Sequence, residues 1–215
     1  MALLTLDKLD QACDAANRGL TIDANNKSLQ QIRSKIAARR NTVDALTEKK
    51  KAEEATRAKG NLVKSTALKA RQIRTRKTNQ PPDMEGSGGI RLVPDPLSPE
   101  SMLEFPVVFL YPMHAQSDFV KAFSEMHCVA DHLAYIFPLP WDEHAEYATS
   151  QVECFMDTVS GGLVKVGKKL PLLKILAGGK VEVVDELVRV YVVPTGLVGM
   201  FIGEMKARSG KTSGS

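Results

Sequence analysis

The stretch Phe105–Phe123, with the sequence FPVVFLYPMHAQSDFVKAF, constrains the possible fold most strongly. It opens with Phe105–Tyr111, an apolar and β-branched run that stops at a proline and is too short to span a membrane, which is typical of a buried strand. Ser117 and Asp118 are candidate helix-capping residues, because short oxygen side chains bond the free N–H groups at a helix start. Three apolar residues then follow at helical spacing on one face, Phe119, Val120 and Phe123, and we expect Phe119 and Phe123 to lie in the interior. We therefore predict a strand followed by a capped helix, on which everything after residue 100 packs.

Further helices and strands, joined by short turns, are predicted after this stretch. A helix is predicted over 129–137, and a Pro-Leu-Pro segment followed by Trp141 closes the region. Apolar alternation and Gly/Pro punctuation predict a helix over 169–177 and four strands, over 151–157, 163–166, 180–193 and 196–202. Strands in succession with grouped helices indicate an α+β domain around an antiparallel sheet.

Helices of two kinds are predicted in the first 77 residues. Residues 1–40 carry apolar residues at three- and four-residue spacing on both sides of a polar turn, which is similar to the last helices of a tetratricopeptide repeat array. Such a pair cannot bury its apolar face alone, so we expect the chain to begin within the last repeat of a longer parent. Over 41–77 the apolar stripe thins and strong helix formers predominate, which predicts a long, solvated basic helix.

Prolines and glycines separate this helical part from the rest of the chain. Residues 78–100 contain five prolines and the run Gly-Ser-Gly-Gly, a composition that predicts a flexible linker. The α+β domain is expected over 101–206. The polar, Gly/Ser-rich end over 207–215 is expected to be a disordered tail.

Charge is distributed unevenly along the chain. Residues 31–80 hold 15 Lys/Arg against 4 Asp/Glu, whereas the remainder holds 14 against 21. A basic helix over 33–77 would meet a phosphate backbone favourably, so binding to a ribosome or RNA is one hypothesis. The alternative is an exposed helix that caps the last repeat and spaces the domains. The lack of aromatic residues over 31–80 favours this alternative, because bases would have no stacking platform.

Features of the whole chain bear on its compartment. No apolar run approaches the ~20 residues of a membrane span, and residues 1–10 lack the basic start of a secretory signal. The three cysteines have no paired spacing, which favours free thiols in a reducing compartment: Cys13, Cys128 and Cys154. We therefore expect a cytoplasmic protein, with the nucleus as an additional compartment and no membrane contact.

No arrangement of residues predicts catalysis. Cys128 and His132 are spaced one helical turn apart, but nothing supplies the second ligand pair of a zinc site, so a packed thiol and a hydrogen-bonded histidine are favoured. His114 and Asp118 have no G-x-S-x-G nucleophile motif near them. The remaining candidates for acid–base chemistry also fit the first turn of a helix: Asp142, Glu143 and Glu146. We expect no enzyme activity, no cofactor and no metal.

Four short motifs occur in order: FPVVFLYP at 105–112, QSDF at 116–119, ADHL at 130–133 and PWD at 140–142. With the helices before them, they resemble the C-terminal part of a eukaryotic cochaperone family that carries tetratricopeptide repeats. That family works with the heat shock protein 90 and heat shock protein 70 chaperones. The resemblance implies a non-enzymatic adaptor in protein folding and a wheel-like α+β domain in which a curved sheet wraps around helices. The implied partners are both chaperones and a client such as translation elongation factor two.

The resemblance also bears on individual residues. In this family, basic and amide side chains clamp the C-terminal carboxylate of the chaperones, and they belong to helices upstream of those expected here, so we do not expect the clamp in this chain. Trp141 fits either a binding anchor or a core residue whose N–H finds a carbonyl. Eight residues of the motifs are candidates for partner contact or for defining the domain: Tyr111, Gln116, Asp118, Phe119, Asp131, His132, Trp141 and Asp142.

Overall fold

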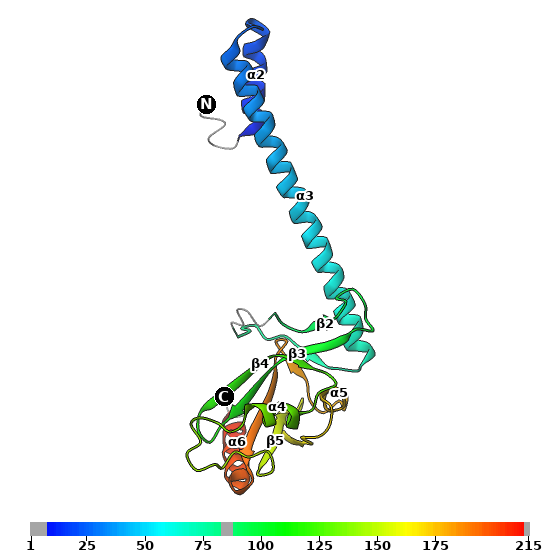
Figure 1. Ribbon diagram of the computed structural model, residues 1–215, viewed down its shortest axis with the longest axis vertical. Coiled ribbons are helices and arrows are strands. Elements are labelled where there is room, and N and C mark those ends of the chain that lie inside the picture. The colour runs from blue at the N-terminus through cyan, green and yellow to red at the C-terminus, as the bar shows by residue number, and fades with distance from the viewer. Residues whose placement is uncertain (1–7, 83–87, 213–215) are drawn as a thin grey trace. The chain divides into compact units, whose positions relative to one another are not determined.

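The computed structural model describes residues 8–82 and 88–212, with side chains up to residue 207 (Figure 1). The chain divides into two compact units, Met1–Lys59 and Gly60–Ser215. The described part of the first unit holds two helical segments joined by a turn, and the second unit contains all the strands of the described residues. We describe each unit by itself.

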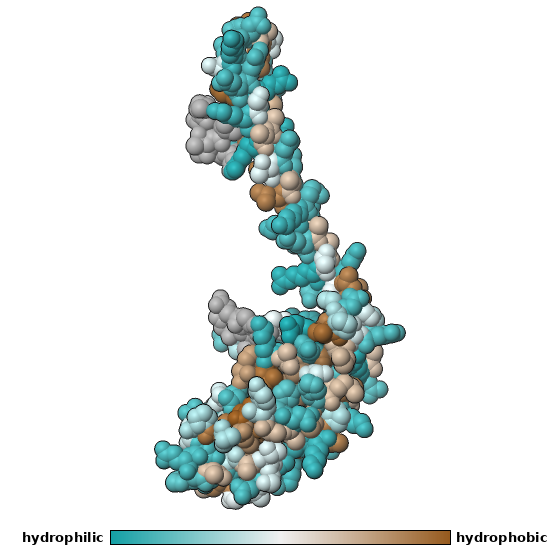
Figure 2. All heavy atoms as spheres, viewed as in Figure 1, coloured by the Kyte–Doolittle hydropathy of each residue, from teal (hydrophilic) through white to brown (hydrophobic). Residues whose placement is uncertain are grey.

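The first unit is a helix pair formed by α2 (Leu9–Ile22) and the beginning of α3 (Lys27–Ala70). Its small core consists of Ala12, Ala16 and Ile36. Gly19 allows a close approach of the two helices, because a Cβ at this position would lie 2.7 Å from Leu29 Cδ1. The helices predicted over 1–40 are confirmed from residue 9 onward. The predicted basic helix belongs to the same continuous helix α3, and Figure 2 shows mostly hydrophilic side chains along this segment.

The last turn of α3 belongs to the second unit and ends in a hydrogen-bonded cap. The Gln72 N–H donates to the Lys69 carbonyl at 3.0 Å, and the Ile73 N–H donates to the Leu68 carbonyl at 2.9 Å. Gln72 takes the left-handed conformation that this pattern requires, with φ of 57°. Leu68 and Ile73 are both buried, so the cap also contributes an apolar contact to the core. The helix therefore stops at residue 70, short of the predicted residue 77.

A six-stranded mixed sheet forms the frame of the second unit. Its strand order is β2-β3-β8-β5-β6, and β4 pairs with β3. The pair β3–β8 is parallel and the other pairs are antiparallel, so the prediction of an antiparallel sheet is wrong at this pair. The strands are β2 (Arg91–Val93), β3 (Met102–Tyr111), β4 (Gln116–Ser124), β5 (Val152–Asp157), β6 (Leu163–Val166) and β8 (Val188–Pro194).

Part of the predicted flexible linker is ordered. Residues 91–93 form β2. Before the linker, in the segment predicted to be the end of the basic helix, β1 (Thr75–Arg76) pairs in parallel with β7 (Val183–Val184) in a second small sheet. The predicted strand over 180–193 is split into β7 and β8 by a turn in which Asp185 and Glu186 adopt positive φ. Residues 83–87 of the linker lie outside the described residues.

Three α-helices accompany the sheet: α4 (Val129–Ile136), α5 (Leu172–Leu176) and α6 (Val198–Thr212), the last preceded by a 3-10 turn over Thr195–Leu197. The predictions of α4 and α5 are confirmed, although α5 is shorter than expected. The predicted strand over 196–202 is wrong, because Phe201 is buried from a helix and packs on Phe155 with ring centroids 5.8 Å apart. Helix α6 continues to Thr212, through most of the segment expected to be a disordered tail. Residues 213–215 of that segment lie outside the described residues.

The segment predicted to be a helix from Ser117 onward is strand β4. Val107 pairs with Val120, and Phe105 pairs with Phe123, so two steps along β3 match three steps along β4. This irregularity places Val120 and Phe123 opposite residues of one buried face of β3. A spacing of three between apolar residues of a strand mimics the period of a helix, which explains the wrong prediction.

A buried ion pair joins the end of α3 to the hairpin β3–β4. Arg71 Nε lies 2.8 Å from Glu125 Oε2, with the two side chains 17% and 3% exposed. The other Glu125 oxygen accepts a hydrogen bond from the Leu103 N–H at 3.0 Å. The Arg71 guanidinium also donates to the carbonyls of Pro99 and Ser101, at 3.0 and 2.8 Å. One side chain thus connects three segments of the chain.

Replacing Arg71 with Met should lower the free energy of unfolding by about 3 kcal/mol, because it leaves the Glu125 charge buried without a partner. The matched control is Arg76→Met. Arg76 forms an ion pair with Glu182, but the Arg76 side chain is 55% exposed. This control should cost under about 1 kcal/mol. Urea denaturation followed by circular dichroism measures both. Equal losses in the two variants would contradict the structural role assigned to Arg71.

Candidate functional site

An aromatic cluster closes the turn end of the hairpin β3–β4. Tyr111 is fully buried, and its ring centroid lies 5.2 Å from that of Trp141 and 5.3 Å from that of Tyr147. His114 stands 5.1 Å from the Trp141 ring, and its Nδ1 is 3.1 Å from the Tyr147 hydroxyl. Tyr111 and Trp141, both candidates from the sequence, therefore pack on one another, with Trp141 half-buried at the edge of the core.

A hydrogen bond connects this cluster to β4. The Tyr111 hydroxyl donates to Asp118 Oδ2 at 2.8 Å. Burial raises the pKa of Tyr111 well above its ordinary value, and the bond to Asp118 adds to the increase. The tyrosine therefore stays protonated and holds the Asp118 carboxylate in place.

Two more candidates have local structural roles. Asp142 accepts hydrogen bonds from the backbone N–H groups of Glu146 and Tyr147, at 3.0 and 2.7 Å, and so shapes the loop after Trp141. This loop contains no helix, so the predicted helical turn at residues 142–146 is wrong. Gln116 is exposed and pairs with Tyr111 across the hairpin.

The other four candidates line one groove of about 540 Å³ between β4 and α4, which we call the edge groove. Asp118 and Phe119 come from β4, whereas Asp131 and His132 come from α4. Phe119 is 49% exposed, so its predicted place in the interior is wrong. The groove is completed by residues that the sequence analysis did not single out: Val120, His127, Tyr135 and Ile136.

A pair of histidines forms one wall of the edge groove. His127 Nδ1 lies 3.2 Å from His132 Nε2, and the His132 ring stacks on Phe123 with centroids 3.9 Å apart. Burial lowers the pKa of His132 below its ordinary value of 6.5, and the neighbouring His127 lowers it further. The His132 side of this wall is therefore uncharged at neutral pH.

Asp131 caps the helix that carries this wall. Its Oδ2 accepts a hydrogen bond from the Cys128 N–H at 2.9 Å, which closes a capping box at the start of α4. Hydrogen bonds from the Cys128 side chain and backbone lower the pKa of Asp131, whereas burial raises the pKa of the Cys128 thiol. Asp131 is thus a fixed negative charge on the rim, and Cys128 is a protonated thiol.

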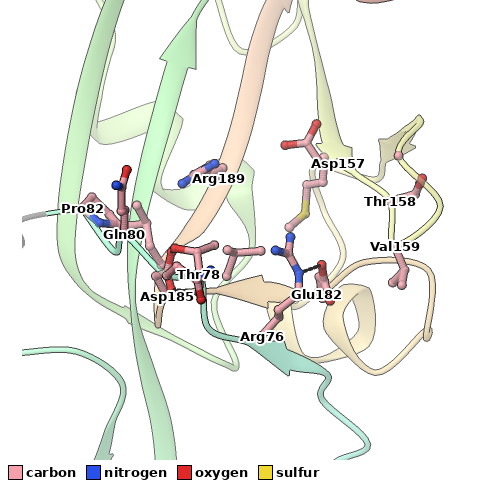
Figure 3. A pocket seen from close by; sticks show the side chains of 15 residues that line it. Arg76, Thr78, Gln80, Pro82, Asp157, Thr158, Val159, Glu182, Asp185 and Arg189 are labelled. Carbon is pink, nitrogen blue, oxygen red and sulfur yellow. Dashed lines mark hydrogen bonds and ion pairs between the residues drawn. The ribbon is translucent and has the colours of Figure 1, made fainter. Parts of the chain in front are cut away.

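A larger hollow of about 940 Å³, the linker pocket, lies where the segment after α3 passes over β5, β7 and β8 (Figure 3). Arg76 Nε bonds Glu182 Oε1 at 2.7 Å, and Thr78 donates to both carboxylate oxygens of Asp185, at 2.7 and 2.6 Å. The Thr78 hydrogen bonds lower the pKa of Asp185. These charged side chains are engaged in holding the linker segment, so the pocket serves to anchor it.

The described residues form neither a metal site nor a membrane-spanning helix. No group of three or more His, Cys, Asp and Glu side chains in residues 8–82 and 88–212 is arranged to hold a metal ion. No helix of the described part has both the length and the apolar character needed to cross a membrane. Cys13, Cys128 and Cys154 are free thiols.

One missed residue, Tyr135, had a recognisable signal in the sequence. The buried residues of α4 are Val129 and Leu133, so its core stripe recurs every four residues. Tyr135 falls off this stripe and is 93% exposed. A large aromatic residue off the apolar stripe of an amphipathic helix is a candidate for partner contact when a second exposed aromatic residue, here Phe119, lines the same groove. His127 gave no such signal, because its place beside His132 depends on the turn before α4.

The fold defines a protein with a helix pair followed by an α+β domain whose mixed sheet is flanked by short helices. Residues 95–205 match the family model described as the Cns1/TTC4 Wheel domain. The chain therefore belongs to the Cns1/TTC4 family, and residues 95–205 are its Wheel domain.

Individual relatives agree with this assignment. The Hsp70/Hsp90 co-chaperone cns1 of Schizosaccharomyces pombe is 33% identical over 95% of this chain and 57% of that protein. Tetratricopeptide repeat protein 4 of mouse is 31% identical over 80% of this chain and 49% of that protein. A solved structure of the Hsp90 co-chaperone Cns1 from Saccharomyces cerevisiae superimposes with a TM-score of 0.74 at 30% identity, covering 95% of this chain and 68% of that one. The chain thus spans about half the length of the curated relatives it matches.

The lowered pKa of His132 predicts a loss of stability on acidification. In the unfolded state His132 protonates near pH 6.5, whereas in the folded state its pKa is lower. As the pH falls below 6.5, the unfolded state binds more protons than the folded state, so the free energy of unfolding decreases.

The variant His132→Phe should lose less stability than the natural chain between about pH 7.5 and about pH 5.5. His144→Gln, which removes an exposed histidine of the same domain, is the control and should behave like the natural chain. Urea denaturation at both pH values measures the difference. An unchanged pH dependence in the His132→Phe variant would contradict this assignment.

Proposed function

We propose that this chain is a non-enzymatic adaptor in chaperone-assisted protein folding and that its Wheel domain contacts a chaperone or a client. The observation that carries this proposal is the family membership, because fungal relatives in the same family are named as Hsp70/Hsp90 co-chaperones. Heat shock protein 90 and heat shock protein 70 are accordingly the proposed chaperone partners. The proposed compartment is the cytoplasm, which the three free cysteines favour.

Translation elongation factor two is the proposed client. Its motivation is the ordered set of motifs around FPVVFLYP and PWD, through which the sequence resembles cochaperones that act on this factor. The edge groove supports a binding role, because Phe119 and Tyr135 expose aromatic surface beside it. Apolar surface gathered beside a groove marks interaction sites, and aromatic residues such as tyrosine are enriched among binding hot spots.

A second candidate function rests on helix α3. All of residues 44–59 are exposed, and this segment carries Lys49, Lys50 and Lys51 in succession. Binding of a ribosome or RNA through this surface would depend strongly on salt, because each neutralised phosphate releases counterions. A contact made by the Wheel domain would depend much less on salt.

The full chain should bind purified heat shock protein 90, heat shock protein 70 or elongation factor two with an affinity that changes little between about 50 and about 200 mM salt. Reversing the charges of Lys49, Lys50 and Lys51 to Glu should leave this affinity unchanged. Isothermal titration calorimetry with each purified protein measures both effects. Binding to ribosomal RNA alone, lost at the higher salt and in the triple variant, would favour the second function instead.

Removing the exposed aromatic surface of the groove with Phe119→Ser and Tyr135→Ser should weaken partner binding about tenfold, because truncating aromatic hot spots costs on the order of 1–2 kcal/mol. The matched control is Leu170→Ser together with Met200→Ser, which removes apolar side chains that are 48% and 56% exposed elsewhere in the domain. Equal affinities of the two double variants would place the contact outside the groove.

A further inference from the structure

Strand β4 has an open edge. It pairs with β3 from Gln116 to Ser124, and no other strand among the described residues pairs with its second side. Figure 1 shows β4 at the margin of the sheet, with α4 beside it. An unpaired strand edge presents a row of N–H and C=O groups, which is a template for the addition of another strand.

The register of the hairpin shows which side chains of β4 face the groove. Asp118 pairs with Phe109, and Val120 pairs with Val107. Phe109 and Val107 are fully buried, so Asp118 and Val120 point to the same, inner face of the sheet. Both residues are half-buried and line the edge groove together with Ile136 of α4. A strand added beside β4 would place alternate side chains over this face.

The lining of the edge groove determines which side chains an added strand should carry. Its lining holds two carboxylates, Asp118 and Asp131, and no lysine or arginine among the described residues. Val120, two residues from Asp118 along β4, and Ile136 of α4 add apolar surface to the same lining. Residues two apart on a strand share a face, so a partner strand would present a basic side chain to Asp118 and an apolar one to Val120.

We propose that the open edge of β4 binds an extended segment of a partner protein as an added antiparallel strand. This segment carries an apolar residue two positions before a lysine or arginine. The proposal rests on the proposed function, because it specifies how the Wheel domain holds its chaperone or client. Antiparallel addition continues the antiparallel pairing that β4 already makes with β3. Because the added strand runs opposite to β4, its apolar residue beside Val120 comes before its basic residue beside Asp118. Backbone hydrogen bonds supply affinity and the two side chains supply selectivity.

The probe is the terminally blocked peptide Thr-Val-Thr-Ile-Thr-Lys-Thr, in which Ile and Lys take the proposed positions. Nuclear magnetic resonance of the full chain, with hydrogen exchange of the β4 amides, is the readout. On peptide binding, alternate amides within residues 117–123 should become protected, because only the N–H groups that point away from β3 are free to pair. Docking through side chains alone would leave these amides unprotected and would overturn the proposal.

Two isosteric variants test the charge selectivity. Asp118→Asn keeps an oxygen that accepts from the Tyr111 hydroxyl but removes the charge, and it should weaken peptide binding about fivefold. The matched control is Asp157→Asn on β5, because Asp157 likewise accepts from a tyrosine hydroxyl, that of Tyr191 at 3.2 Å. This control should bind the peptide as the natural chain does. Equal weakening in both variants, or no peptide binding by the natural chain, would overturn the proposal.

Sedimentation of the free chain tests the alternative that a second copy of the same chain pairs with the open edge of β4. A dimer whose β4 amides are already protected without peptide would overturn the proposal. Failure of this proposal can be distinguished from failure of the proposed function. Chaperone or client binding without protection of β4 amides by the peptide overturns this inference alone. Protection of these amides without any binding of the chaperones or elongation factor two overturns the proposed function alone.

Discussion

The buried contact between Arg71 and Glu125 is the interaction on which the second unit depends. It connects the end of α3, the segment before β3 through two carbonyls, and the residue that follows β4. Buried charges are costly to desolvate, and this pair is tolerable because each partner is also hydrogen-bonded. The hairpin β3–β4 is thus held at its open end by Glu125 and at its turn end by the bond from Tyr111 to Asp118. The edge groove lies along β4, between these two fixed points.

Much of the fold could be predicted because local patterns and tertiary structure agree there. The strands over 152–157 and 163–166 and the helix α4 lie where alternation and helical spacing indicate them. Three predictions failed where long-range pairing decided the outcome. The irregular register of β3 and β4 gives Val120 and Phe123 a helical spacing within a strand, and the parallel pairing of β3 with β8 depends on a connection that no local pattern specifies. At Phe201, burial against Phe155 favours a helix in an apolar segment that also fits a strand.

The candidate site was predictable only in part, because motif residues of a core and of a surface look alike in one sequence. The structure separates them: Tyr111 and Trp141 pack in the aromatic cluster, whereas Asp118, Phe119, Asp131 and His132 line the groove. Grouping these four residues requires the hairpin register and the position of α4, which come from tertiary packing. The role of Asp118 illustrates the difference, since its bond to a buried tyrosine sets the direction of its carboxylate.

The aromatic cluster also makes intrinsic tryptophan fluorescence a probe of one unit of the protein. Trp141 is the only tryptophan of the chain, and all four tyrosines belong to the second unit. Its indole lies within about 5 Å, between ring centroids, of Tyr111, Tyr147 and His114. Intrinsic fluorescence therefore follows the packing of the Wheel domain alone, and the helix pair is silent in this signal. A loss of helical ellipticity at constant tryptophan emission would identify melting of the first unit, without labels and without cutting the chain.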